Sequence, residues 1–509
     1  MRLTLKTEVV NNVLAQRAPS QINLKVNDLA YWAANFAILG AAFFSMYVNN
    51  AYPLLAVAVP LILLDRAYVV PVLLFIAAIE GAFKIEDAAS VAESRAIELI
   101  MPFFIYDYFI NNSKKIPFKL SLLYLIFGVF CIIGMFVYSG NKNIQQFLAP
   151  LTHEKSGAAG IYLKMFMKVI KLVFFFLYLK VLVNKDKTLF YRALTLIKDM
   201  APYLTMLVLL NMLMFGTVSA KFDTLHFGES HHGDFSANMN ALGVFIYLGI
   251  FEPKTSVFKR FINLCALGCL LFIIMNLASR NGLLCFVILG VLAGGLGLWN
   301  LNWSLKVVIV VATIGVAGIA GYLFKDSPTV ERFIYQTEEA GGGDRVAYWS
   351  AGLASLKEDP LLGLGGDETA SLYAVGKYSP EVEDHVMHNT FIEFAVEYGW
   401  FGFTFFCIFV GTILWHSYKN FVFAVTYGDL LLAVPGISYF ISIFAGLFVS
   451  RVWESTLWYN MTMIFAIYIL WRKPVEDALK NRKGALIHGL PDPMLDPALP
   501  INDLSYQGK

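Results

Sequence analysis

The segment DHVMHNTFIEFAVEYGWFGF, residues 384–403, places proton-carrying side chains at the start of an apolar run. His385 and His388 lie three residues apart, and Glu393 and Glu397 follow, four residues apart. Side chains at i and i+4 share one face of a helix, so the two carboxylates are expected to line one wall of a site. An imidazole titrates near neutral pH, which makes His388 a candidate general base that takes a proton from an attacking hydroxyl.

A metal site is the alternative for these residue types. One ligand set would be His385, His388 and Glu393, and the other would come from the loop segment HFGESHHGD. The first set lacks the HExxH spacing, and the second follows no standard ligand pattern. We therefore expect no metal ion and no other cofactor. The loop set consists of His226, His231, His232 and Asp234.

Three arginines lie at the ends of apolar segments that we expect to face away from the cytoplasm. Arg280 lies in NLASRNGLLCF, Arg345 opens RVAYWSAGLASLKE, and Arg451 lies in FVSRVWESTLW. A charge near bilayer depth is costly and marks a candidate functional site. A guanidinium group offers phosphate oxygens a planar fork of donors. The three together favour a diphosphate site at headgroup level, whereas each one alone is equally consistent with snorkelling.

A stripe of lysines lies in another apolar segment. Lys164, Lys168 and Lys171 are spaced at i, i+4 and i+7, which places them on one helix face. They could add positive charge to a diphosphate site, but snorkelling to headgroups is the favoured interpretation. Lys164 and Lys168 remain candidate substrate-binding residues.

Composition sets the class of the protein. Of its 509 residues, 58% are hydrophobic and 15% charged, whereas soluble domains have roughly 25% charged residues. The chain is therefore expected to be an all-α polytopic membrane protein with about 12–14 transmembrane helices. A net charge of +2 gives no reason to expect nucleic-acid binding. The candidate spans lie near 29–48, 51–64, 67–83, 95–111, 118–139, 162–183, 200–219, 238–252, 261–278, 282–299, 305–324, 391–415, 430–449 and 454–471.

The basic residues set the expected orientation. The short connections NNSKK, NKDK and VFKR are basic, which by the positive-inside rule predicts that both termini are cytoplasmic. Most histidines then fall on the outer side. The expected order is a cytoplasmic N-terminal segment (1–28), transmembrane helices (29–324), a large outer loop (325–390), C-terminal transmembrane helices (391–471) and a flexible cytoplasmic tail (472–509).

The outer loop is expected to contain an amphipathic helix. Val346, Trp349, Leu353 and Leu356 recur at helical spacing within RVAYWSAGLASLKE. Such a helix would lie on the membrane surface or across the mouth of the helical bundle.

Four motifs occur in an order that resembles the O-antigen ligase and polymerase superfamily. They are SANMNALG, SRNGLL, GGGDRVAYWSAGLASLKEDPLLGLG and HNTFIEFAVEYGWFG. The resemblance covers about Phe227 to Trp471, near half of the chain. The N-terminal half resembles the family only in having many spans.

The resemblance implies a fold related to the C-class integral-membrane glycosyltransferases, in the bacterial inner membrane, with the large loop in the periplasm. It implies an inverting, metal-independent transfer from an undecaprenyl-diphosphate-linked glycan. Arg280 and Arg345 would hold the diphosphate, and His388 would be the catalytic base or orient the acceptor. The residues expected to shape the substrate site are Asn389, Glu393, Glu397, Arg451, Lys164, Lys168, Asn240 and Trp349.

Three functions remain open. Polymerisation of an O-antigen or exopolysaccharide is favoured, because the many spans and the length suit the variable polymerases better than the compact ligases. The alternative is a ligase that transfers the glycan to lipid A-core or another acceptor. A flippase for the same lipid is a third hypothesis, disfavoured because the charges gather at one face and no repeat is visible. A separate flippase and a chain-length regulator are the further partners expected.

Overall fold

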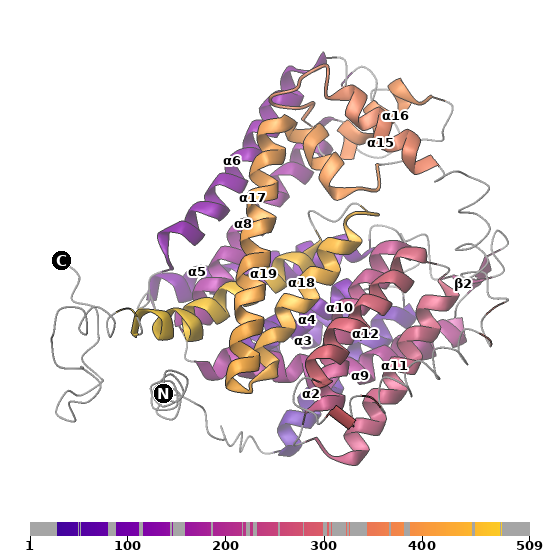
Figure 1. Ribbon diagram of the computed structural model, residues 1–509, viewed down its shortest axis with the longest axis vertical. Coiled ribbons are helices and arrows are strands. Elements are labelled where there is room, and N and C mark those ends of the chain that lie inside the picture. The colour runs from indigo at the N-terminus through magenta and orange to yellow at the C-terminus, as the bar shows by residue number, and fades with distance from the viewer. Residues whose placement is uncertain are drawn as a thin grey trace.

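The apolar runs form helices, because in lipid each backbone polar group must find its partner within the segment. The computed structural model confirms the all-α polytopic membrane fold (Figure 1). The described residues also include one short hairpin, in which Thr217–Ser219 (β1) pairs antiparallel with Thr224–His226 (β2). The structure describes 28–48, 52–79, 88–110, 116–142, 158–184, 187–215, 217–219, 224–226, 232–252, 255–277, 279–298, 344–365, 368–380, 387–449 and 454–478, together with positions 50, 145, 303, 304, 307, 322, 325 and 480.

Helices make up nearly all of the described residues. They are α2 (Asp28–Val48), α3 (Tyr52–Leu64), η1 (Arg66–Tyr68), α4 (Val69–Ile79), α5 (Ala88–Ile110), α6 (Phe118–Gly140), α8 (Ala158–Asn184), α9 (Lys187–Phe215), α10 (His232–Phe251), α11 (Val257–Asn276), α12 (Arg280–Leu298), α15 (Asp344–Ser355), α16 (Glu368–Tyr378), α17 (Thr390–Tyr427), η3 (Leu430–Ala433), α18 (Val434–Ala445), α19 (Ser455–Ile467) and η4 (Tyr468–Arg472).

Five of the described helices, α2, α6, α9, α11 and α17, are long and apolar enough to cross a membrane. Shorter apolar helices accompany them, among them α3, α10, α12 and α18. The largest differences from the predicted spans are that α9 already begins at Lys187, in a predicted connection, and that α17 continues to Tyr427. The predicted span 305–324, the N-terminal segment up to residue 27 and the tail from residue 481 lie outside the described residues, with isolated positions excepted.

The helical bundle has two ends, which α19 and η4 connect. At the start of α19, Thr456 donates a hydrogen bond of 2.9 Å to Asn238 near the start of α10. At the end of η4, the Trp471 ring lies 5.2 Å from that of Phe190 near the start of α9. Ser455 to Arg472 cover about 27 Å at about 1.5 Å per residue, close to the thickness of a hydrocarbon core. We call the end near Asn238 the site end and the end near Phe190 the pocket end.

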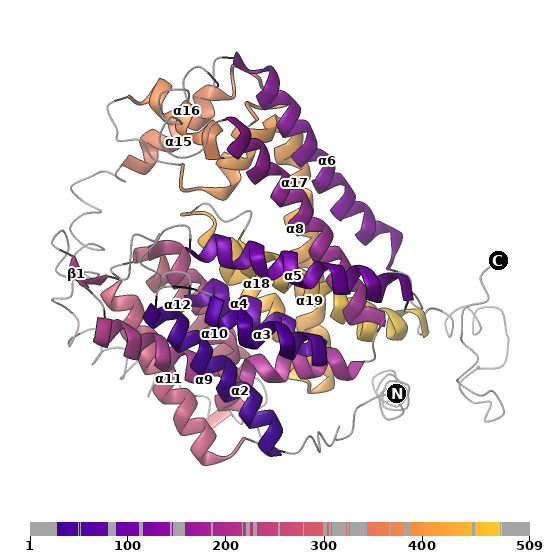
Figure 2. The same cartoon turned by 180° about the vertical axis from the view of Figure 1, so that it is seen from behind.

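A second hydrophobic core lies beyond the main bundle, around α15 and α16. Both views place these helices beside the upper ends of α6 and α17 (Figures 1 and 2). Tyr138 of α6, Met165 of α8, Tyr348 of α15, Tyr373 of α16 and Val396 of α17 are all buried in it. The loop helices are thus packed onto three long helices.

The buried face of α15 differs from the predicted stripe. Tyr348 and Ala351 are buried, whereas Val346 and Leu353 of the stripe are 53% and 50% exposed. Leu356 of the stripe is buried, just after the helix ends. Small residues decide which face packs, because they allow close approach: a Cβ at Gly352 would lie 2.5 Å from the Met387 sulfur. Hydrophobic spacing alone did not identify this face.

Glycines fasten the PLLGLG segment to α17. Gly363 and Gly399 both have positive φ, 73° and 65°, and a Cβ at Gly363 would lie 2.4 Å from the Gly399 nitrogen. The amide of Leu364 donates to the Val396 carbonyl at 2.8 Å, and the amide of Trp400 donates to the Pro360 carbonyl at 2.8 Å. The two backbones meet where α17 is kinked at Gly399, which only residues without a side chain allow.

Candidate active site

The first turn of α17 is fixed to the turn that follows α18. The Asn389 side chain caps α17 by accepting hydrogen bonds from the amides of Phe391 and Ile392 at 3.0 and 3.1 Å. Its Nδ2 donates to the Leu447 carbonyl at 3.1 Å. The hydroxyl of Thr390 donates to the Val449 carbonyl at 2.8 Å. Asn389 therefore positions the backbone next to His388.

His388 has a φ of 48°, the one positive value among the described residues other than glycine. Such a conformation persists only where the surroundings enforce it, and it is concentrated at functional sites. Two neighbours fix it here. Asn389 anchors the following residue, and Trp349 Nε1 donates to the Met387 carbonyl at 3.1 Å on the preceding side. The Tyr348 ring lies edge-on, 6.3 Å from the imidazole. Trp349 therefore acts on the backbone at His388.

Arg345 lies close enough to Arg280 to be affected by its charge. Arg280 is the first residue of α12, and the neighbouring Asn281 Nδ2 donates to the Ala445 carbonyl at 3.4 Å. The Arg345 guanidinium lies 5.9 Å from the centroid of the Phe448 ring. Burial and then the positive charge of Arg280 lower the pKa of Arg345, while Tyr348 opposes them. The two guanidinium groups are thus close enough to repel each other.

The turn 445–449 is the common contact of these residues. Ala445 accepts from α12, Leu447 and Val449 accept from the start of α17, and Phe448 meets Arg345 of α15. The structure thereby gathers Arg280, Arg345 and the neighbourhood of His388 at the site end. Sequence reasoning missed this turn, because the carbonyls that make the contacts exist at every residue.

The two glutamates of α17 are 4% exposed and face protein. The Ser371 hydroxyl of α16 donates to Glu393 Oε1 at 3.5 Å. The backbone carbonyl of Glu397 accepts from the amide of Gly365 at 3.0 Å. The Glu393 side chain is therefore directed towards α16, and the backbone at Glu397 contacts the PLLGLG segment.

Asn240 ties α10 to α12 next to Arg280. Its Nδ2 donates to the carbonyls of Ser236 and Gly282 at 2.9 and 3.0 Å. The side chain is fully buried, which favours a positioning role. Lys168 of α8 is also buried, at 9% exposure. Arg451, His385 and the side chain of Lys164 lie outside the described part of the chain.

Asn238 is a polar residue of the site end that sequence reasoning overlooked. It accepts from the Thr456 hydroxyl at 2.9 Å, and its Nδ2 donates to Glu454 Oε2 at 3.4 Å. Within SANMNALG, Asn238 and Asn240 lie two residues apart, so they point to different sides of α10. The motif thus contributes one asparagine towards α12 and one towards α19.

No group of three His, Cys, Asp or Glu side chains within the described residues is arranged to hold a metal ion. The side chains of His226, His231, His232 and Asp234 lie outside that part of the structure.

The comparison with known families agrees with the motifs. Residues 265–407 match the family model described as O-antigen ligase. The matched range contains Arg280, Arg345, His388 and both glutamates, but neither Asn240 nor Arg451. No curated protein matches the chain. The predicted resemblance is confirmed for residues 265–407 of this membrane protein, which match an O-antigen ligase domain and so support glycosyl transfer of the ligase or polymerase type.

Proposed function

We propose that this protein extends a polysaccharide at the periplasmic face, using a glycan linked to undecaprenyl diphosphate as donor. The observation that carries the proposal is the meeting of Arg280, Arg345 and the strained His388 segment around the turn 445–449. The O-antigen ligase domain supports the same reaction class.

The donor diphosphate would bind between Arg280 and Arg345. Two guanidinium groups that repel each other gain most from an anion placed between them, and each offers paired donors to phosphate oxygens. Partial burial of Arg345 strengthens this attraction, because less water screens the charges.

His388 would act on the acceptor. Its imidazole takes the proton from an acceptor hydroxyl while that oxygen forms a bond to the anomeric carbon of the donor. The bond from this carbon to the diphosphate breaks on the opposite side, so the configuration inverts and undecaprenyl diphosphate leaves. The two arginines offset the charge on the departing diphosphate, which is the function of a preorganised anion site.

The proposed sidedness rests on the charges at the pocket end. Lys198 pairs with Glu252 at 2.7 Å and Lys259 with Asp199 at 3.6 Å, near the junction of α10 and α11. Cations on that side are expected to face the cytoplasm, which supports N-in and C-in termini and a periplasmic site end.

Deletion of the gene followed by analysis of lipid-linked intermediates tests the proposal. A polymerase is expected to leave single repeat units on undecaprenyl diphosphate, restored to long chains by the wild-type gene. Long chains on the carrier with none on lipid A-core would instead identify a ligase. Repeat units retained at the cytoplasmic face would identify a flippase, and an unchanged glycan profile would contradict all three.

A further inference from the structure

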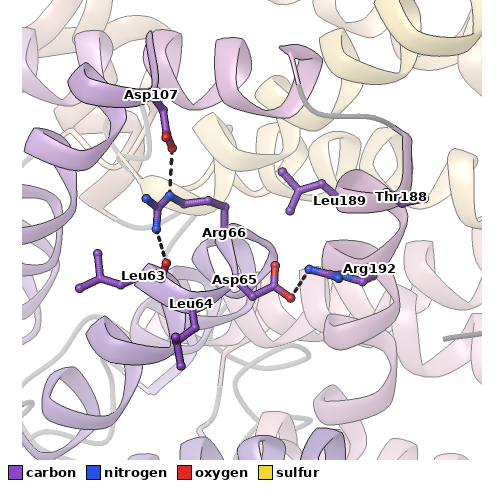
Figure 3. Close-up of a pocket in the computed structure, with 8 residues that line it drawn as sticks. All are labelled: Leu63, Leu64, Asp65, Arg66, Asp107, Thr188, Leu189 and Arg192. Carbon is purple, nitrogen blue, oxygen red and sulfur yellow. Dashed lines mark hydrogen bonds and ion pairs between the residues drawn. The ribbon is translucent and has the colours of Figure 1, made fainter. Parts of the chain in front are cut away.

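A pocket of about 380 Å³ lies at the pocket end, between the last residues of α3, the second half of α5 and the first turn of α9. Figure 3 shows its polar lining: Arg66 extends between Asp107 and the Leu63 backbone, and Arg192 approaches Asp65 from α9. The proposed glycan-transfer site does not include this pocket, since α19 and η4 separate the two ends by about 27 Å.

The arginines retain donors that the described residues do not use. Arg66 Nε donates to Asp107 Oδ2 at 3.0 Å, and its Nη1 donates to the carbonyls of Ile62 and Leu63 at 2.7 and 2.9 Å. Within the described part of the chain, neither N–H group of its Nη2 has a hydrogen-bond acceptor. Arg192 pairs with Asp65 through Nη2, so its Nη1 can still donate hydrogen bonds to a ligand. A guanidinium group has five N–H donors, so both can still bind an oxyanion.

The formal charge of the polar lining is zero. Two arginines face two aspartates, and the first turn of α9, with Thr188 and Leu189, adds partial positive charge from its backbone amides. A phosphate alone would approach the carboxylates of Asp65 and Asp107. A ligand that carries a phosphate and an ammonium group satisfies both kinds of lining residue.

The rim of the pocket is apolar and exposed. Leu63 and Leu64, the last residues of α3, line the pocket and are 39% and 84% exposed. The ring centroid of Phe103 on α5, 38% exposed, lies 5.8 Å from the Arg66 guanidinium carbon. Exposed apolar side chains beside a charged floor, at the ends of helices, are typical of the boundary between headgroups and hydrocarbon. We propose that this pocket binds the headgroup of a zwitterionic phospholipid, with the phosphate on Arg66 and Arg192 and the ammonium near Asp107.

Native mass spectrometry of the delipidated full chain in detergent tests the proposal. Phosphatidylethanolamine and phosphatidylglycerol with identical acyl chains are offered in equal amounts. We expect the wild type to retain phosphatidylethanolamine in about tenfold excess, since the second lipid lacks the ammonium group. Equal retention of the two lipids would contradict the proposal without any variant.

Two variants test which residue binds the ammonium group of the lipid and which binds its phosphate. Asp107→Asn keeps an acceptor for Arg66 and is expected to remove the preference between the lipids. Arg192→Gln is expected to weaken the binding of both lipids about tenfold. Arg260→Gln, on α11, is the matched control and should change neither the preference between the lipids nor the affinity for them. Unchanged lipid ratios and affinities in both pocket variants would overturn the assignment. Thermal unfolding with and without each lipid gives a second measurement.

Soluble glycerophosphoethanolamine separates a lipid from a free phosphate ester. It should fail to displace the lipid at equal concentration, because it lacks the chains that would contact Leu64. Displacement at equal concentration would identify a soluble ligand and overturn the lipid proposal. None of these measurements uses glycan transfer, so their outcome is independent of the proposed reaction.

Discussion

The two ends of the bundle each contain a pair of arginines, and the two pairs are compensated differently. At the pocket end, Arg66 lies 3.0 Å from Asp107, and Arg192 pairs with Asp65. At the site end, burial and then the positive charge of Arg280 lower the pKa of Arg345.

At the pocket end each arginine is paired with a carboxylate, whereas at the site end a second arginine lowers the pKa of the partly buried Arg345 further. An ion pair within the protein offsets the charge of both partners, and removing one partner leaves the other uncompensated. Neighbouring guanidinium groups repel each other, and an anion bound between them, as proposed above, would offset that repulsion. The strained backbone at His388 belongs to the same end, which fits a site where stability is given up for function.

The largest expected effect is at His388. His388→Asn should reduce chain extension by about 10²- to 10⁴-fold, because the base is lost while asparagine tolerates the positive φ. Glycan length in a complemented deletion strain measures it. His388→Ala should also lower the thermal unfolding midpoint, since alanine is strained there. Normal glycan length with His388→Asn would refute the assignment as base.

Arginine substitutions test the comparison itself. Arg345→Gln should reduce transfer by about 10²-fold without lowering the unfolding midpoint, because a repelling charge is removed. Arg66→Gln should leave transfer unchanged in the folded protein. It should lower the free energy of unfolding by roughly 2–3 kcal/mol, because it leaves Asp107 uncompensated. Melting curves and transfer rates in detergent measure both. If Arg345→Gln destabilises as much as Arg66→Gln, the two pairs are not different in kind.

The glycine contact at the site end gives the third prediction. Gly363→Ala should lower the free energy of unfolding by roughly 2–4 kcal/mol, because the φ of 73° is strained and the new Cβ would meet the Gly399 backbone. Limited proteolysis should then cut the α15–α16 region first. Gly268→Ala on α11 is the matched control: nothing lies within 4 Å of its Cβ, so stability should be unchanged or slightly higher. Equal proteolysis of both variants would show that this contact does not hold the loop helices.

Much of the candidate site could be predicted from residue types. Arginines and a histidine beside apolar segments stand out, because such charges are rare at bilayer depth. Asn389 was predicted to bind substrate, but its side chain is used to cap α17 and to donate to the Leu447 carbonyl. Asn238 escaped prediction because its partners, Thr456 and Glu454, lie more than 200 residues away.

The sequence by itself determined the membrane class, the helices and the residue types that could bind a diphosphate and move a proton. Only the tertiary structure decided that they meet. The turn 445–449 gathers α12, α15 and α17 through carbonyls and one ring, and Gly363 is fastened to Gly399 through bare backbone. Side-chain chemistry is specific to residue type and therefore visible in sequence, whereas backbone contacts depend on which segments the fold brings together.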